Sequence, residues 1–185
     1  MLQGQKVLLR PVKRADIEYF LKWLNDPEVI QYLTPYWPLT EMSEEKWIEN
    51  LGVDRDKVVF MVEALEGSSS KPLDAAQGTS IGYLALHNIS AKDHNASFEI
   101  AIGEKDYWSS GYGTEAARLL VKYGFEQLNL HRINSGVYAF NERSLRMHRK
   151  VGFKEEGRQK EWIFKNGKFH DHVIFGILGD DWRSL

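Results

Sequence analysis

The chain has 185 residues, of which 43% are hydrophobic and 27% charged, and its formal net charge is −2. This length allows one domain with a substantial core, and the composition is that of a globular protein. The absence of cysteine excludes disulfides, thiolate metal sites and a cysteine nucleophile, and the net charge argues against a general nucleic-acid binder. No signal peptide and no apolar stretch of membrane-spanning length are visible, so we expect a cytoplasmic protein without membrane contact.

Hydrophobic patterning predicts strands and helices in alternation. Runs of apolar residues bounded by turn residues indicate strands, and apolar residues spaced three and four apart indicate amphipathic helices. Asn166-Gly167 is a strong turn signal and predicts a hairpin between the last two strands. The predicted elements are a strand over 6–10, helices over 15–24 and from Ser43, strands over 58–65, 80–87 and 96–103, a helix over 114–128, a strand over 133–139, a helix over 142–151, strands over 153–164 and 169–178, and a loop over 66–72. This order favours an α+β or mixed α/β fold with helices packed against a sheet.

Charge is spread unevenly along the chain. Residues 24–56 contain eight acidic residues against Lys46 and Arg55, whereas residues 104–185 contain fourteen basic and eleven acidic residues. A solvated helix face would explain the acidic segment. The functional alternative is an acidic wall that attracts a cation, while the later part of the chain meets an anion.

The most informative motif is Trp108-Ser109-Ser110-Gly111-Tyr112-Gly113-Thr114, which joins a predicted strand to a predicted helix. Glycine allows a tight turn, and a helix start offers unpaired N–H groups at the positive end of the helix dipole. Such a loop can hold a phosphate or pyrophosphate with main-chain donors, although it can also be only a turn. The element order disfavours a dinucleotide-binding unit, since the glycines come after several strands, and a P-loop lysine is missing.

A second motif lies downstream, where Asn141-Glu142-Arg143-Ser144 opens a short helix that ends before Gly152-Phe153. Asn is a good helix N-cap and Gly a good left-handed residue after a helix, so capping explains much of this stretch. Together the two motifs resemble the GNAT (GCN5-related N-acetyltransferase) family. They are most similar to the branch that includes ribosomal-protein N-terminal acetyltransferases and spermidine acetyltransferases. The resemblance implies a single N-acetyltransferase domain over residues 1–185, with a mostly antiparallel twisted sheet of about seven strands and helices on both faces.

The resemblance also implies that the protein transfers an acetyl group from acetyl-CoA to a primary amine without a metal. The loop is then expected to hold the pyrophosphate, the edge of the strand over 100–103 to pair with the pantetheine, and the start of the second helix to lie beside the pantetheine and the sulfur. Core packing is the alternative for the two isoleucines of that strand. Trp108 stands where the family usually has Gln or Arg, a departure that this branch commonly shows. The implied donor-binding residues are Ile100, Ala101, Ile102, Gly103, Trp108, Ser109, Ser110, Gly111, Tyr112, Gly113, Thr114, Asn141 and Ser144.

Amine acetylation requires proton transfer, because only a neutral amine attacks a thioester and a lysine-like amine has a pKa of about 10.4. Glu99 is predicted as the base, directly or through water, since it lies within an otherwise apolar strand; a solvent-facing side chain is the alternative. Many relatives carry a tyrosine as the acid where this chain has His148. His148 or Ser144 is therefore predicted to donate a proton to the leaving thiolate. This departure leaves open a non-catalytic acyl-CoA-binding regulatory module, and a longer acyl group is a further possibility.

The resemblance implies that the two early helices and the loop that joins them form the wall of the site that faces the acceptor. Tyr32, Tyr36 and Trp37 are predicted to face a cationic acceptor, with packing as the alternative. A protein N-terminus, a polyamine and an aminoglycoside all remain open. His170-Asp171-His172 is weak evidence for a metal, and no metal site is predicted. The last hairpin offers strand edges through which a homodimer is possible.

Overall fold

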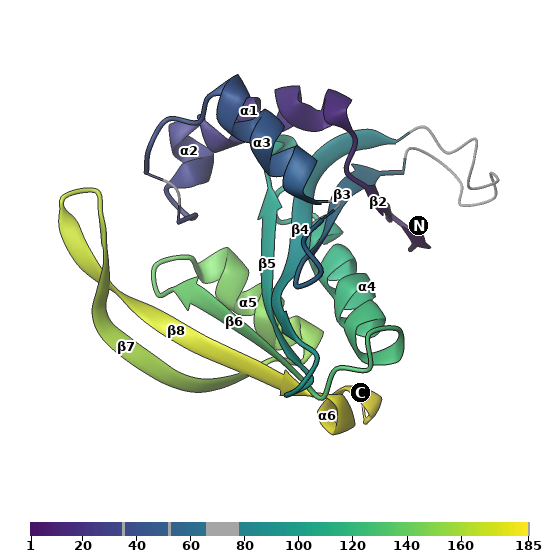
Figure 1. Ribbon diagram of the computed structural model, residues 1–185. Helices are drawn as coiled ribbons and strands as arrows, with labels where there is room; N and C mark the ends of the chain where they lie inside the picture. Colours follow the sequence, from purple (N-terminus) through teal and green to yellow (C-terminus); the bar gives the residue numbers. More distant parts are fainter. Residues whose placement is uncertain (35, 52, 66–77, 185) are drawn as a thin grey trace.

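The computed structural model describes residues 1–34, 36–51, 53–65 and 78–184, and within them the strands form one eight-stranded sheet (Figure 1). The predicted loop over 66–72 lies outside the described residues. In spatial order the sheet runs β1-β2-β3-β4-β5-β6-β8-β7, and its neighbouring strands are antiparallel except for the β5–β6 pair. The strands are β1 (Leu2–Gln3), β2 (Val7–Pro11), β3 (Val58–Ala64), β4 (Thr79–Ser90), β5 (Asn95–Ile102), β6 (Arg132–Tyr138), β7 (Lys154–Lys165) and β8 (Lys168–Leu178).

Helices cover both faces of this sheet, as predicted. Met61 of β3 packs into a cluster with the first helices, whereas its neighbours Phe60 and Val62 face α4 and α5 on the opposite side. The α-helices are α1 (Ile17–Leu24), α2 (Pro27–Ile30), α3 (Glu41–Leu51), α4 (Tyr112–Glu126), α5 (Glu142–Val151) and α6 (Gly179–Arg183), with 3₁₀ turns η1 (Arg14–Asp16) and η2 (Lys105–Tyr107). The mixed α+β class with a mostly antiparallel sheet is therefore confirmed.

The differences from the predicted elements have local causes. The sheet has an eighth strand because Leu2–Gln3 pairs with Leu8 and Leu9, a segment too short to show a pattern. The helix predicted from Ser43 begins at Glu41, since Thr40 precedes it and its Oγ1 accepts the Ser43 N–H at 3.2 Å. A short helix, α2, follows α1 although no helix was predicted between residue 24 and Ser43. It forms because the Asp26 side chain caps its start.

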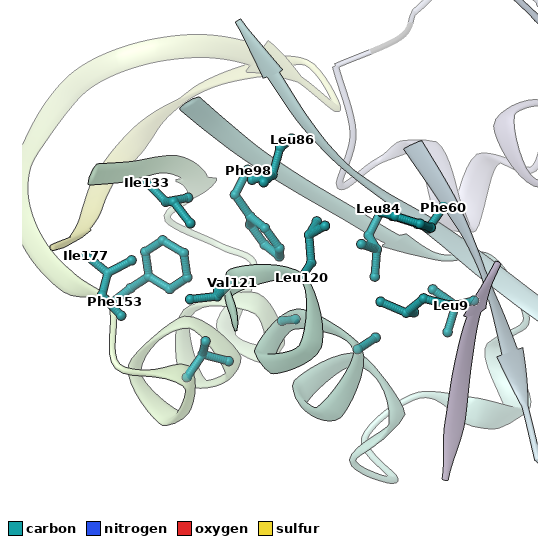
Figure 2. Close-up of a cluster of buried hydrophobic side chains, with 14 of the residues drawn as sticks. Leu9, Phe60, Leu84, Leu86, Phe98, Leu120, Val121, Ile133, Phe153 and Ile177 are labelled. Carbon is teal, nitrogen blue, oxygen red and sulfur yellow. The ribbon is translucent and has the colours of Figure 1, made fainter. Parts of the chain in front are cut away.

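The core beneath α4 and α5 is a cluster of buried hydrophobic side chains (Figure 2). It is formed by aliphatic and aromatic side chains from six strands and both helices, among them Leu9, Phe60, Leu84, Leu86, Phe98, Leu120, Val121, Ile133, Phe153 and Ile177. Gly124 of α4 lies against this layer, and a Cβ there would come within 2.9 Å of Ile133 Cδ1. Close packing therefore accounts for a glycine within a helix.

The parallel contact between β5 and β6 is short. Only Asn95, Ala96 and Ser97 pair with residues 132–134, and beyond this point the two strands are no longer paired. Among the described strands none pairs with this edge of β5 over the rest of its length, while its other edge stays paired with β4 as far as Ile102. This gap in the middle of the sheet positions the candidate site.

Candidate active site

A cavity of about 640 Å³ lies at the gap between β5 and β6. Its walls come from both strands, the loop before α4, the start of α5, and the α1–α3 side of the sheet. The predicted site residues that line it are Tyr32, Glu99, Ile100, Ala101, Ile102, Trp108, Ser109, Gly111, Gly113, Thr114, Asn141, Ser144 and His148. The other predicted residues do not line it: Gly103, Ser110, Tyr112, Tyr36 and Trp37. The fold thus gathers most of the predicted residues around one cavity.

The loop before α4 ends in a helix start without a side-chain cap. Gly111 is the N-cap residue and has a left-handed backbone with φ 92°, which glycine adopts at little cost. The Glu115 N–H makes the first helical hydrogen bond, to Gly111 O at 3.1 Å. The N–H groups of Tyr112, Gly113 and Thr114 therefore lack helical partners, and they make no hydrogen bond to another described residue. Three free donors at the positive end of a 15-residue helix form an anion site.

Lys6 brings a cation to this loop from the turn between β1 and β2. Glu115, in the first turn of α4, accepts the backbone N–H groups of Gln5 at 2.5 Å and Lys6 at 2.9 Å. The Lys6 ammonium donates to Ser110 O at 3.1 Å and lies 5.6 Å from the centre of the Tyr112 ring. No local pattern in the sequence marks Lys6 as part of the site, because 104 residues separate it from Ser110. Its charge adds to the anion-attracting field of the helix start.

The open edge of β5 presents main-chain groups to the cavity. Ser135 Oγ lies 3.1 Å from Phe98 O, and the Trp108 indole N–H donates to Ile102 O at 2.6 Å. Because alternate residues of a strand direct their main-chain groups to opposite edges, the N–H and C=O of Ile100 and the N–H of Ile102 face the same gap. The Ile102 carbonyl already has a donor in Trp108, so it is the less available acceptor on this edge.

His148 lies in the core rather than at the surface of the site. Its side chain is 2% exposed, stacks on Phe175 and meets Phe98 and Phe153 edge-on. Nδ1 lies 2.8 Å from Ser144 O and Nε2 lies 2.8 Å from Ser135 Oγ. Burial lowers the pKa of His148 to about 4, so the ring is neutral at pH 7.

The neutral ring orders the groups around it. Because a carbonyl faces Nδ1, the ring proton is on Nδ1, and the one hydrogen of the Ser135 hydroxyl is shared between Nε2 and Phe98 O. The Ser144 hydroxyl lies 3.3 Å from Nδ1, which already donates to the carbonyl, so its hydrogen stays available to the cavity. The acid role predicted for His148 stays a prediction, but it would need a charged form that this burial makes costly.

Glu99 lies on the other face of the sheet, the one that α1–α3 cover. Its side chain is 51% exposed, and Oε2 lies 3.7 Å from His87 Nε2. Nearby, burial raises the pKa of Tyr83, and the charges of Glu99 and Glu44 raise it further. The two carboxylates and the phenol thus belong to one group on the α1–α3 side of the cavity.

The three aromatic residues predicted to face the acceptor, Tyr32, Tyr36 and Trp37, differ in their surroundings. Tyr32 does face a cation, but it is one of this chain's own: the Arg143 guanidinium lies 5.0 Å from its ring centre and 3.9 Å from that of Trp108. Arg143 therefore connects Trp108, in the loop before α4, with Tyr32 on the α2 side of the cavity. Tyr36 and Trp37 stack on each other at 5.3 Å and are 74% and 72% exposed. Their predicted contact with substrate stays a prediction.

The histidines of β8 make contacts within the protein. His172 Nδ1 lies 3.2 Å from Gln159 Oε1, and His170 Nε2 lies 3.2 Å from Lys165 O. Among the residues that the structure describes, no group of three or more His, Cys, Asp or Glu side chains could hold a metal ion. None of the described helices has the length and apolar character needed to cross a bilayer.

An uncapped helix start beside an open strand edge is a site for a ligand that combines a phosphate group with an extended amide chain. The family model described as acetyltransferase (GNAT) domain matches residues 6–154. The chain belongs to the GNAT acetyltransferase family, as the motifs predicted. Members of this family use acetyl-CoA.

Several relatives are named for amine acetylation. The chain is 30% identical to the spermidine N(1)-acetyltransferase of Escherichia coli K12 over 182 residues, which cover 96% of this chain and 89% of that protein. It is 32% identical to the putative ribosomal N-acetyltransferase YdaF of Bacillus subtilis over 107 residues, 58% of each chain. A crystal structure of spermidine N-acetyltransferase from Vibrio cholerae in complex with CoA and spermine matches with a TM-score of 0.83 and 25% identity, covering 96% of this chain and 98% of that one.

Proposed function

We propose that residues 1–185 act as one N-acetyltransferase domain that moves an acetyl group from acetyl-CoA to a cationic primary amine, with both substrates bound together. The observation that carries this proposal is that a single cavity joins the uncapped start of α4 to the open edge of β5. The first feature suits a diphosphate and the second suits the amides of pantetheine, which can add to a strand edge. Together they match the two ends of coenzyme A.

The donor would lie along the gap with its diphosphate on the N–H groups of residues 112–114 and with Lys6 nearby. The pantetheine amides would pair with the Ile100 carbonyl and the Ile102 N–H. The thioester would then lie between β5 and the start of α5. This arrangement directs the sulfur toward Ser144 and the acetyl carbonyl toward the face of the sheet that carries Glu99.

Side-chain and main-chain groups of the protein then stabilise each charge that develops during the reaction. The acceptor ammonium first releases one proton to solvent, and Glu99, directly or through water, accepts the second proton as the neutral nitrogen attacks the acetyl carbon. A main-chain N–H of β5, that of Ile100 or Ile102, stabilises the negative carbonyl oxygen. When the C–S bond breaks, the thiolate takes the electron pair and accepts a hydrogen bond from the Ser144 hydroxyl. His148 acts behind Ser144 as a positioning residue, and the thiolate takes its final proton from solvent or from Glu99.

The acceptor class follows from charge. The α1–α3 side of the cavity carries Glu44 and Glu99 together with aromatic rings, which favours a cation over a neutral amine. Relatives named for spermidine acetylation support a polyamine, and a relative named as a putative ribosomal N-acetyltransferase supports a protein N-terminus.

An assay of thiol release from acetyl-CoA with a panel of amines tests the function. Glu99→Gln is expected to lower kcat by about 10²-fold or more at pH 7, the usual contribution of a general base, and the loss should shrink as the pH approaches the pKa of the amine, about 10.4 for a lysine-like amine, where the amine is already neutral. Its affinity for CoA should not change, because the side chain faces the acceptor side. His87→Gln is the matched control, since it removes the ring near Glu99 and leaves the carboxylate. Binding of CoA without transfer to any amine would contradict the proposal and favour a non-catalytic acyl-CoA-binding module.

We further propose that the protein is a homodimer formed through the hairpin of β7 and β8. β7 is an edge strand of twelve residues that is exposed along nearly all its length. Large apolar rings lie exposed at the hairpin end: Trp162, Phe164 and Phe169, at 59%, 59% and 62%. A second copy would cover both the open edge and these rings.

A further inference from the structure

One acidic residue of the α1–α3 side differs from the others. The inference drawn from it rests on the proposed function, since this residue lines the same cavity. Glu44 of α3 is 6% exposed. Within the described residues its carboxylate makes no hydrogen bond and no ion pair. No side-chain nitrogen or oxygen in that part of the chain is both sealed off and without a partner, so the Glu44 oxygens face the open space of the cavity.

Neighbouring acids are already neutralised by basic side chains of the same surface. Lys105 pairs with both Asp26 and Glu28, Lys22 pairs with Glu104, and Arg14 pairs with Glu45. No such pair involves Glu44 among the described residues. Its own neighbour Lys46 is exposed. Of the eight acids of residues 24–56, Asp26, Glu28 and Glu45 are paired, and Glu44 is the one buried carboxylate among the described residues of this segment that has no ion pair, which leaves it available to a ligand.

Aromatic rings line the same cavity as this carboxylate. Phe20, Trp47 and Tyr83 line the same cavity, with the Phe20 ring centre 4.9 Å from that of Trp47 and 5.2 Å from that of Tyr83. Burial raises the pKa of Glu44, since nothing nearby offsets the cost of its charge. An ammonium group bound there would supply that compensation and would also meet the negative faces of the rings. The pocket is thus built for an alkylammonium group with its aliphatic stem.

Tyr83 relates this pocket to the reaction. Its phenol is close enough to both Glu44 and Glu99 for each charge to disfavour its ionisation. Glu44, Tyr83 and Glu99 line the same cavity, so an acceptor whose reacting nitrogen lies beside Glu99 can place a second ammonium group at Glu44. We propose that the acceptor is a linear diamine or polyamine, and that Glu44 with Phe20, Trp47 and Tyr83 binds the ammonium group that does not react. A protein N-terminus fits less well, because its peptide groups would lose water among these rings.

Matched pairs of amines test this subsite. We would measure kcat and KM for 1,3-diaminopropane, putrescine, cadaverine and spermidine, and for the monoamines of the same chain lengths. Wild type should favour diamines over their monoamines. Glu44→Gln should lower kcat/KM for diamines by about 30-fold or more, as expected for truncating a buried charge pair, chiefly through KM. It should leave the monoamines unchanged. Glu45→Gln is the matched control, because Glu45 is the next residue and pairs with Arg14.

A binding measurement separates this proposal from the proposed function. Calorimetric titration of putrescine into the CoA-bound protein requires no transfer, and Glu44→Gln should abolish the heat while CoA binding and the melting temperature confirm that it is folded. If no amine is acetylated yet putrescine binding depends on Glu44, the subsite stands and the proposed transfer fails. Equal losses for monoamines and diamines would overturn the subsite and place Glu44 at the reacting nitrogen. Diamine binding that survives Glu44→Gln, or a preference for peptide N-termini, would also overturn it.

Discussion

At the scale of single residues, burial decides what each titratable group can do. His148 and Glu99 both line the cavity, yet one is a neutral core ring with a lowered pKa and the other a half-exposed carboxylate. The histidine occupies both its nitrogens with Ser135 and Ser144. A buried ring that is fully bonded holds its partners in place at low energetic cost, whereas charging it would require moving an ion into the core. Position, rather than residue type, therefore separates the two roles.

The lowered pKa of His148 predicts a pH dependence of stability. The unfolded chain binds a proton near pH 6.5 and the folded chain only near pH 4, so stability is full above about 6.5 and falls as the pH drops toward 4. The shift corresponds to a loss of about 3 kcal/mol in the free energy of unfolding. His148→Gln should be less stable at pH 7 but should lose this slope in urea titrations between pH 4 and 7. The exposed His131→Gln should keep it, and identical slopes for wild type and His148→Gln would disprove the assignment.

At the scale of elements, helix ends create the binding groups. α4 begins at a left-handed Gly111 and leaves donors free, whereas α5 begins at Asn141, whose side chain accepts the Ser144 N–H at 3.1 Å. The two helix starts lie at one cavity, but only the first is uncapped. The capped helix serves as a support for Ser144 and Arg143, and the uncapped helix is available to an anion.

The uncapped start predicts a distinctive effect of Gly111→Ala. A Cβ at Gly111 would meet only Lys6 Nζ at 3.8 Å, so the cost is conformational: φ 92° costs a non-glycine residue about 1–2 kcal/mol. Turning this residue away from the left-handed region would misdirect the donors of residues 112–114. The Kd for CoA should rise about tenfold, as measured by calorimetry.

Gly167→Ala is the matched control for this measurement. Gly167 also has a left-handed φ, 79°, with nothing within 4 Å of a Cβ, but it lies in the hairpin turn. It should lose similar stability and bind CoA like wild type. Equal affinities for the two variants would show that the start of α4 does not hold the diphosphate.

At the scale of the whole molecule, the divergence of β5 from β6 determines where the cavity lies. It exposes the edge of β5 in the middle of the sheet, whose two faces are covered by helices (Figure 1), and the start of α4 and the α1–α3 side both line the cavity at that point. The curved hairpin of β7 and β8 extends beyond α5 (Figure 1), and Lys165 Nζ at its end donates to Ile30 O of α2 at 3.2 Å. The hairpin thus ties the last strands to the acceptor side.

The exposed rings of this hairpin predict the state of association. Light scattering should give twice the mass of one chain, and Phe164→Glu should shift the population to monomers by placing a charge among the apolar rings. Val53→Glu is the matched control, since Val53 is 75% exposed and lies after α3, outside the hairpin. A wild-type protein that stays monomeric at high concentration would refute the proposed dimer.

Signals that the sequence carries locally were enough to predict most elements. Asn141 and Gly152 delimit α5 through backbone geometry that their own residue types favour, and Asn166-Gly167 forms the expected turn with positive φ at both residues. The order of elements and the two motifs led to the right family, and most of the predicted donor residues line one cavity. These features depend on a few neighbouring residues, whose conformational preferences act before any tertiary contact forms.

What only the tertiary structure decided depends on residues far apart in the chain. The sequence does not show where β5 leaves β6, that Lys6 reaches the loop before α4, or that Glu44 alone among the acids of its segment is buried and unpaired in the described structure. Nor does it show that His148 is enclosed by Phe98, Phe153 and Phe175. Burial and pairing are properties of the packed neighbourhood, and the same side chain becomes a base, a core residue or a ligand site according to what the fold places beside it.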